Sequence, residues 1–178
     1  MRPAYQAILY VMEKRLPDYR WEIIFVDDGS VDKSSQVLEE LSVQDENCRV
    51  IELSRNFGKE IALSAGVDNA SGDAVICLDA DLQHPPERIP DMVHEWENGA
   101  EVVEMVRGPS KHEPWLRRIG SNLFYFMLRL ISSTDILSKT TDFRLMDRKV
   151  VDAFCEVEER QRMFRGIIDW LGFRKTSL

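Results

Sequence analysis

The sequence contains little cysteine, no long apolar run and no excess of positive charge. Its three cysteines, Cys48, Cys77 and Cys155, are widely spaced and form no C-x-x-C pair, which excludes a disulfide framework and a cysteine-rich zinc site. The most apolar segment, residues 123–131, is interrupted by Arg129 and is too short to span a bilayer. No signal peptide is recognisable. The net charge of -8 excludes a general nucleic-acid binder, which needs clustered Lys and Arg.

The remaining composition is that of a soluble folded domain. A length of 178 residues, with 44% hydrophobic and 30% charged residues, fits one domain covering the whole chain, residues 1–178. Apolar runs at 21–26, 49–53 and 74–78 alternate with helical patterns, which predicts βαβ units and a mostly parallel sheet flanked by helices, the α/β class. Later elements are expected as strands over 101–106 and 143–146 and as helices over 116–131 and 159–171.

Both ends of the sequence predict a truncated domain. The chain opens on a helix over residues 4–16, although α/β nucleotide-binding units usually begin with a strand. It closes on residues 173–178, which have the pattern of a strand that has just begun. We therefore expect that a first strand is missing.

Two carboxylates and an amide follow the apolar run at 74–78. Asp79, Asp81 and Gln83 are two residues apart, so in extended backbone their side chains point the same way. Carboxylates roughly 6.6 Å apart repel by about 2.5 kcal/mol at an effective dielectric near 20, and Mg²⁺ or Mn²⁺ removes that cost while holding a substrate phosphate. The alternative is a solvated acidic turn, because D-x-D is a short and common string.

A second acidic pair, Asp27-Asp28, ends the strand expected at 21–26. Parallel strands leave a sheet at the same edge, where open α/β sheets bind ligands, so both acidic groups are expected along one rim. An Asp there can accept hydrogen bonds from a nucleotide base or ribose. The alternative is turn chemistry and helix capping by Asp27-Asp28-Gly29-Ser30.

Basic residues form the third group of candidates. Arg55 and Lys59 lie in a loop that leads into a helix, an unfavourable place for positive charge, and Arg117 belongs to a basic stretch over 107–118. Arg162 and Arg165 flank an apolar pair. All five are candidates for substrate binding, and Arg117 with its basic neighbours can grip phosphate; for each the alternative is a solvated surface cation.

Four motifs in a fixed order resemble the inverting family 2 glycosyltransferases of the nucleotide-diphospho-sugar transferase fold. Within that family, the branch that transfers sugars to polyprenyl phosphates is most similar; it includes dolichyl-phosphate mannose synthases and bactoprenol glucosyltransferases. The motifs are Ile24-Phe25-Val26-Asp27-Asp28-Gly29-Ser30, Ser54-Arg55-Asn56-Phe57-Gly58-Lys59-Glu60, Asp79-Ala80-Asp81-Leu82-Gln83-His84-Pro85-Pro86-Glu87 and the stretch from Asp142-Phe143-Arg144 to Val151.

The resemblance implies roles for individual residues. Asp28 is expected at the base or ribose, and Asp79, Asp81 and Gln83 are expected to carry Mg²⁺ or Mn²⁺ on the donor diphosphate. Asp142 is expected near the acceptor, where the family's acid is often called a base. The resemblance also places Arg117 and the region of Arg162 and Arg165 near phosphates.

The implied activity is transfer of a hexose from a UDP- or GDP-sugar to a polyprenyl phosphate at the cytoplasmic face of a membrane. The expected partners are the nucleotide-sugar, a lipid phosphate and the membrane surface, with no nucleic acid; homo-oligomerisation stays open. The alternatives are a family 2 transferase that acts on a saccharide hydroxyl and a non-catalytic nucleotide-binding remnant. Departures from the family are the missing P-x-Y-N-E strand, Thr141 in place of Gly, and the missing C-terminal membrane helices.

Overall fold

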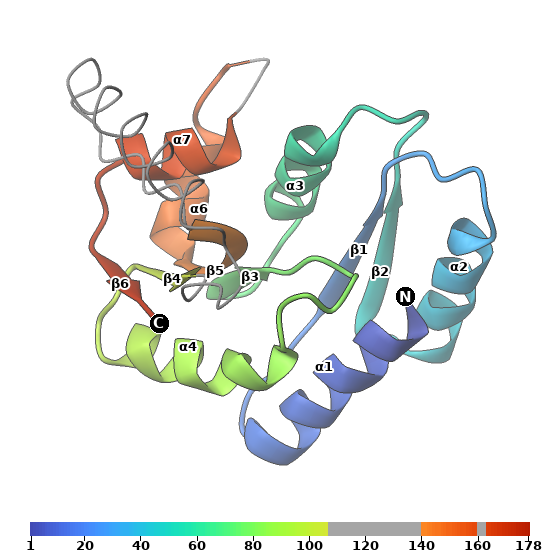
Figure 1. Ribbon diagram of the computed structural model, residues 1–178, viewed down its shortest axis with the longest axis horizontal. Helices are drawn as coiled ribbons and strands as arrows, with labels where there is room; N and C mark the ends of the chain where they lie inside the picture. Colours follow the sequence, from blue (N-terminus) through green and yellow to red (C-terminus); the bar gives the residue numbers. More distant parts are fainter. Residues whose placement is uncertain (107–139, 160–162) are drawn as a thin grey trace, which may run out of the picture.

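The computed structural model describes residues 1–106, 140–159 and 163–178. Within these residues, helices and strands alternate along most of the chain, as the periodicity predicts (Figure 1). The helices are α1 (Arg2–Arg15), α2 (Ser34–Gln44), α3 (Lys59–Asp68), the 3₁₀ turn η1 (Pro86–Arg88), α4 (Ile89–Glu97), α6 (Arg148–Cys155) and α7 (Phe164–Trp170). The strands are β1 (Ile23–Asp27), β2 (Cys48–Glu52), β3 (Ala74–Cys77), β4 (Val102–Val106), β5 (Thr140–Asp147) and β6 (Lys175–Ser177).

The strands form two sheets instead of one. β1 and β2 pair in parallel as a two-stranded sheet, and the other four strands form a second sheet in the order β3-β5-β4-β6. Among the described residues no ladder joins β1 to β3. Both strands therefore keep one unpaired edge, and this interruption separates the two sheets.

The prediction of a mostly parallel sheet needs a correction at β5. This strand lies between β3 and β4 and runs antiparallel to both, whereas β4 and β6 are parallel. The strand expected at 143–146 also extends over the longer span of β5. The expected helix over 116–131 lies outside the described residues.

The strand over 74–78 faces a core on each side, as predicted, because Val75 and Cys77 pack in one and Ala74, Ile76 and Leu78 pack against the other, but most of it is only half-buried. Only Cys77 of β3 is buried, and Ala74, Val75 and Ile76 are half-buried. The reason is that β3 ends its sheet, so that only β5 covers one of its two edges.

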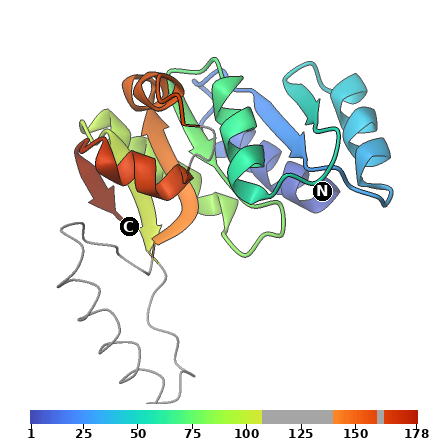
Figure 2. The ribbon, with the colours of Figure 1, turned by 90° about the horizontal axis from the view of Figure 1, so that it is seen from above.

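Helices cover both faces of the sheets and connect the two halves (Figures 1 and 2). On one face α1 and α4 pack on the four-stranded sheet, while α1 also reaches the core between α2 and the two-stranded sheet. On the other face α3 packs on β1 and contacts α6 and α7. Because no strand pairing joins the sheets within the residues described, packing by α1 and α3 is what links them.

The burial of Val11 tests this role of α1. Val11 is 0% exposed in the core beneath the four-stranded sheet, so we expect Val11→Ala to lower the free energy of unfolding by about 2 kcal/mol. Val43→Ala is the matched control, because Val43 on α2 is 83% exposed. Urea unfolding of both variants measures the difference; equal losses would contradict the role given to α1.

Candidate active site

Four charged side chains from four different elements meet in one ionic cluster, formed by Lys59, Asp79, Asp142 and Arg165. Lys59 at the start of α3 places its Nζ 2.7 Å from Asp79 Oδ2 and 2.7 Å from Asp142 Oδ2. Arg165 on α7 grips the same Asp142 carboxylate with two donors: its Nε donates to Oδ1 and its Nη2 donates to Oδ2 at 2.8 Å. Asp142, on β5, is therefore the centre of the cluster.

Burial makes the two cations necessary for Asp142. Its side chain is 4% exposed, whereas Lys59 and Arg165 are 48% and 47% exposed. A buried carboxylate is costly unless it is paired and hydrogen-bonded. Arg165, aided by Lys59, outweighs this burial and holds the pKa of Asp142 well below its usual range. Asp142 is consequently an anion throughout the neutral range.

The pKa values of the two cations are raised, whereas that of Asp142 is lowered. Burial lowers the pKa of Lys59, but its hydrogen bonds to Asp142 and Asp79 outweigh this and raise the pKa above its ordinary value. The hydrogen bond to Asp142 likewise raises the pKa of Arg165. Both side chains keep their charge and, at about half exposure, can still reach an anionic ligand.

The turn after β3 differs from its prediction. The backbone from residue 80 to residue 84 is turned and bent instead of extended, and Leu82 has a positive φ of 59°. Asp81 Oδ1 accepts a hydrogen bond from the backbone N–H of Gln83 at 3.0 Å, a local turn contact. The prediction that Asp79, Asp81 and Gln83 point to one side because the backbone is extended is therefore wrong, whereas their role as metal ligands stays a prediction.

The acidic side chains of this turn fit a shared cation, not a closed protein cage. No group of three or more acidic, histidine or cysteine side chains that could hold a metal occurs within the described ranges. Mg²⁺ usually takes only one or two protein carboxylates, together with substrate phosphates and water. Asp79 and Asp81 supply such a pair, and Lys59 would have to leave Asp79 for a cation to bind there.

Asp28 connects the first acidic pair to the ionic cluster. Its two carboxylate oxygens accept hydrogen bonds from the backbone N–H groups of Phe57 at 2.7 Å and Gly58 at 2.9 Å. These residues immediately precede Lys59, so Asp28 fixes the loop that carries the cation. The family resemblance implies that Asp28 contacts the nucleotide base or ribose, and the structure adds its contact with this loop.

The preceding Asp27 is buried and serves its own turn. Its carboxylate accepts hydrogen bonds from the backbone N–H of Ser30 at 3.0 Å and from the Ser35 hydroxyl. Burial alone would raise its pKa, but these hydrogen bonds prevail and lower it. Asp27 thus stabilises the turn, as the alternative interpretation of this motif expected, but it does not cap α2, whose N-cap is Lys33.

Close packing brings that turn against the loop that contains Arg55. A Cβ atom on Gly29 would lie 2.5 Å from the backbone carbon of Arg55, and Gly29 has a φ of +68°, so only glycine fits. The Arg55 guanidinium lies 4.2 Å from the centre of the Phe57 ring. Arg55 and Lys59 therefore lie on one loop held by Asp28, whereas Arg117 and Arg162 lie outside the described residues.

One residue of the site had no signal in the sequence. Glu60 follows Lys59 on α3, and its Oε2 accepts a hydrogen bond from the backbone N–H of Phe164 at 2.6 Å, 104 residues away. Phe164 opens α7 and precedes Arg165. Glu60 therefore ties the helix of one cation to the helix of the other, a contact that no local pattern encodes.

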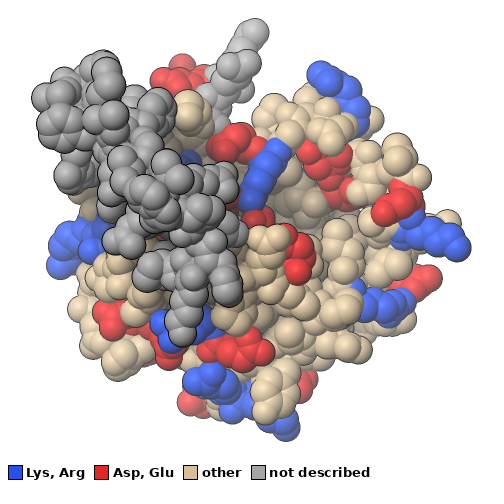
Figure 3. Space-filling view, in the orientation of Figure 1, with Lys and Arg blue, Asp and Glu red and all other residues tan. Residues whose placement is uncertain are grey.

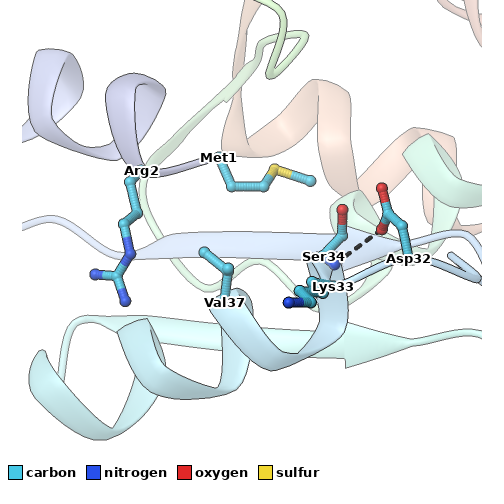
Figure 4. Close-up of a pocket in the computed structure, with 6 residues that line it drawn as sticks. All are labelled: Met1, Arg2, Asp32, Lys33, Ser34 and Val37. Atoms are coloured by element: carbon cyan, nitrogen blue, oxygen red, sulfur yellow. Dashed lines mark hydrogen bonds between the residues drawn. The ribbon is translucent and has the colours of Figure 1, made fainter.

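Charges of both signs are interspersed on the face shown in Figure 3. Recognition of an anion here depends on particular cations, such as Lys59 and Arg165, and not on a broad positive surface. A separate surface hollow lies at the starts of α1 and α2, lined by Met1, Arg2, Asp32, Lys33, Ser34 and Val37 (Figure 4). No member of the ionic cluster lines it.

The low pKa of Asp142 predicts a pH-dependent effect of Asp142→Asn. The pKa of Asp142 is lower in the folded state than the ordinary 3.8, so its stabilisation is full above that pH and is lost as the pH falls through the folded-state value. We expect the variant to lose about 2 kcal/mol of unfolding free energy at pH 7. The difference from wild type should narrow below pH 3.8.

Urea unfolding between pH 7 and pH 3 measures this difference. Asp91→Asn serves as the control, because Asp91 forms only a surface pair with Arg88 in which both side chains are 42% exposed; such pairs contribute roughly 0–1 kcal/mol. A loss for Asp142→Asn that stays constant with pH would mean that the ionic cluster is not its cause.

Comparison with known proteins identifies relatives of the whole chain. An uncharacterized glycosyltransferase of Bacillus subtilis (strain 168) is 42% identical over 174 residues, which cover 98% of this chain and 53% of the relative. A bactoprenol glucosyl transferase of Shigella phage SfV is 40% identical over 159 residues, covering 89% and 52%. The chain thus spans about half the length of these relatives.

Solved structures support the fold. A mannosyltransferase from Pyrobaculum calidifontis, in complex with GDP-Man and Mn²⁺, superimposes with a TM-score of 0.59 at 18% identity, over 94% of this chain and 50% of the other. Staphylococcus aureus TarS superimposes with a TM-score of 0.60 at 15% identity, over 98% and 55%. These likenesses confirm the predicted α/β fold of nucleotide-sugar transferases.

The family model described as glycosyl transferase family 2 matches residues 4–154. This match includes Lys59, Asp79 and Asp142 of the ionic cluster, whereas Arg165 on α7 lies beyond it. With the relatives at about 40% identity, it shows that the chain belongs to glycosyl transferase family 2.

Proposed function

We propose that this glycosyltransferase moves a hexose from a UDP- or GDP-sugar to a polyprenyl phosphate, with inversion and with the help of Mg²⁺ or Mn²⁺. The name of the Shigella phage relative, a bactoprenol glucosyl transferase at 40% identity, supports a lipid-linked acceptor. The reaction then takes place at the cytoplasmic face of a membrane.

Among the residues that the structure describes, no helix combines the length and apolar character needed to cross a bilayer.

The contacts of Lys59 and Arg165 with Asp142 are the observation that favours a phosphate acceptor. An efficient general base has a pKa near the working pH, and a carboxylate held by two cations is a weak base. An acceptor hydroxyl needs its proton removed during attack, whereas a phosphate is already an anion near neutrality. Asp142 therefore suits a phosphate acceptor, which it orients through its two cations without taking a proton.

The donor site is assembled from the residues around the ionic cluster. Asp79 and Asp81, with Gln83, are the proposed ligands of a cation shared with the donor diphosphate. Lys59 and Arg165 have donors left for the same phosphates, because each is about half exposed. The base or ribose is assigned to Asp28, beside the turn that Asp27 stabilises, and further phosphate contacts are assigned to three arginines: Arg55, Arg117 and Arg162.

The transfer itself is a single displacement at the anomeric carbon. An oxygen of the acceptor phosphate forms a bond to that carbon while the bond to the donor diphosphate breaks on the opposite face, which inverts the configuration. A divalent cation, when bound, supplies Lewis-acid stabilisation of the leaving diphosphate. Lys59, once released from Asp79, can stabilise the negative charge that develops on the leaving diphosphate.

Two alternatives remain distinct from this proposal. Transfer to a saccharide hydroxyl would require Asp142 to act as a base, against the effect of its two cations. A non-catalytic protein of the same fold would bind the nucleotide without transferring a sugar. The intact ionic cluster favours the enzyme.

Binding of the donor tests the metal ligands. We expect UDP-glucose or GDP-mannose to bind the wild-type chain more tightly with Mn²⁺, and Asp81→Ala to weaken that binding at least tenfold, about 1.4 kcal/mol. Calorimetric titration with and without Mn²⁺ measures the effect, and Asp91→Ala on α4 is the control. Equal affinity of Asp81→Ala and wild type in Mn²⁺ would remove Asp81 from the metal site.

Transfer of labelled sugar tests the acceptor. With undecaprenyl phosphate in detergent we expect a labelled lipid product, and Asp142→Asn to slow its formation on the order of 100-fold by losing orientation. Saccharides with free hydroxyls should yield no product. Product from a saccharide alone would assign the chain to the hydroxyl-transferring branch of the family.

A further inference from the structure

A second pair of charged residues lies buried beneath the ionic cluster. Glu104 on β4 and Arg144 on β5 are directly opposite one another in the antiparallel register, and their side chains are only 3% and 0% exposed. Arg144 Nη1 lies 3.5 Å from Glu104 Oε1. Lys175 on β6 adds a second positive charge 3.7 Å from the same oxygen.

Stability does not account for this pair. Glu104 Oε1 and two Arg144 nitrogens, Nε and Nη1, are buried without a hydrogen-bond partner. A buried ion pair offsets its loss of hydration only with excellent geometry and further hydrogen bonds, and apolar residues of similar volume are often equally or more stabilising. Apolar residues are therefore expected to be at least as stable as this pair in the strand interior.

The contacts of Arg144 lead to Asp142. The two residues are two apart on β5, so their side chains point to the same face of the sheet. Arg144 Nη2 donates a hydrogen bond at 3.3 Å to the carbonyl oxygen of Thr141, the residue directly before Asp142. Arg144 thus holds the peptide that carries the central carboxylate.

The other contact of Arg144 leads to the partner of Asp142. Its guanidinium carbon lies 5.7 Å from the centre of the Phe164 ring, within the range of a cation–π contact. Phe164 opens α7 and is followed by Arg165, which grips Asp142 with two donors. One buried guanidinium therefore touches the backbone on one side of the Asp142–Arg165 pair and the helix start on the other.

We propose that Arg144, held in place by Glu104, is a positioning residue that sets the two-donor contact between Arg165 and Asp142. The catalytic value of that contact rests on the proposed function, but the geometry does not depend on the identity of donor or acceptor. Replacing the buried pair with apolar residues should leave the fold intact and loosen the contact above it.

The test compares wild type with the double variant Glu104→Met/Arg144→Met. The readout is hydrogen exchange of the Arg165 Nε–H, followed by NMR in the guanidinium region and assigned by its loss in Arg165→Lys. We expect the double variant to keep or exceed the wild-type melting temperature, while its Arg165 Nε–H exchanges at least tenfold faster. If the Arg165 Nε–H of a stable double variant exchanges at the wild-type rate, the proposal is overturned and the pair has a purely structural role.

A matched control removes a different polar contact to the same strand. Trp96 Nε1 donates to Asp147 at the far end of β5, at 2.8 Å, so Trp96→Phe should leave the Arg165 signal unchanged. Faster exchange in this control, equal to that of the double variant, would also overturn the proposal, because any disturbance of β5 would then suffice.

Two further outcomes are separable. If the double variant fails to fold, Arg144→Lys replaces it, since lysine keeps the charge opposite Glu104 but cannot reproduce the planar guanidinium contacts; the same exchange criterion applies. In the transfer assay, Glu104→Met/Arg144→Met, or Arg144→Lys in its place, should lower kcat at least tenfold, while KM for UDP-glucose should stay within twofold of the wild-type value. Absence of any transfer by wild type, with the NMR result as expected, would refute the proposed substrates and leave this inference standing.

Discussion

The neutralisation of Asp142 is the interaction on which the site depends. A carboxylate that is 4% exposed cannot stay ionised without opposite charges, and Lys59 and Arg165 supply them from two helices on the same face of the sheet. Their placement in turn requires that α3 and α7 start close to the beginning of β5. The hydrogen bond from Phe164 to Glu60 joins these two helix starts, and Asp28 holds the loop before α3. The surrounding polar contacts thus serve one buried anion.

The interruption of the sheet gives this arrangement its location. β1 and β2 form one sheet and the strands around β5 form the other, and the loop before α3 leads from the first to the second. Asp28 belongs to the first half, whereas Asp79 and Asp142 belong to the second. Because Asp28 binds the backbone just before Lys59, the loop before α3 joins the acidic turn of the first half to the ionic cluster of the second.

Much of the fold was predictable, because its helices and strands follow local periodicity. β1, β2, β4 and α1 lie within a few residues of their expected bounds. The errors concern relations between distant segments. β5 was expected in a parallel sheet, but it enters between β3 and β4 in the opposite direction, and nothing in its own residues specifies its neighbours. The turn after β3 was expected to be extended, but Leu82 adopts a positive φ and Asp81 bonds to its own turn.

The order of the amino acids alone specified the chemical groups of the site: acidic residues where strands end, basic residues where helices begin, and four motifs shared with a family. Folding alone determined which of them meet. Arg165 lies 23 residues from Asp142, and Arg144 of the fourth motif forms a buried pair with Glu104, which lies in no motif. The physical reason is that the charge state and partner of a side chain depend on its burial and on distances between residues far apart in the chain, whereas sequence periodicity reports only on near neighbours.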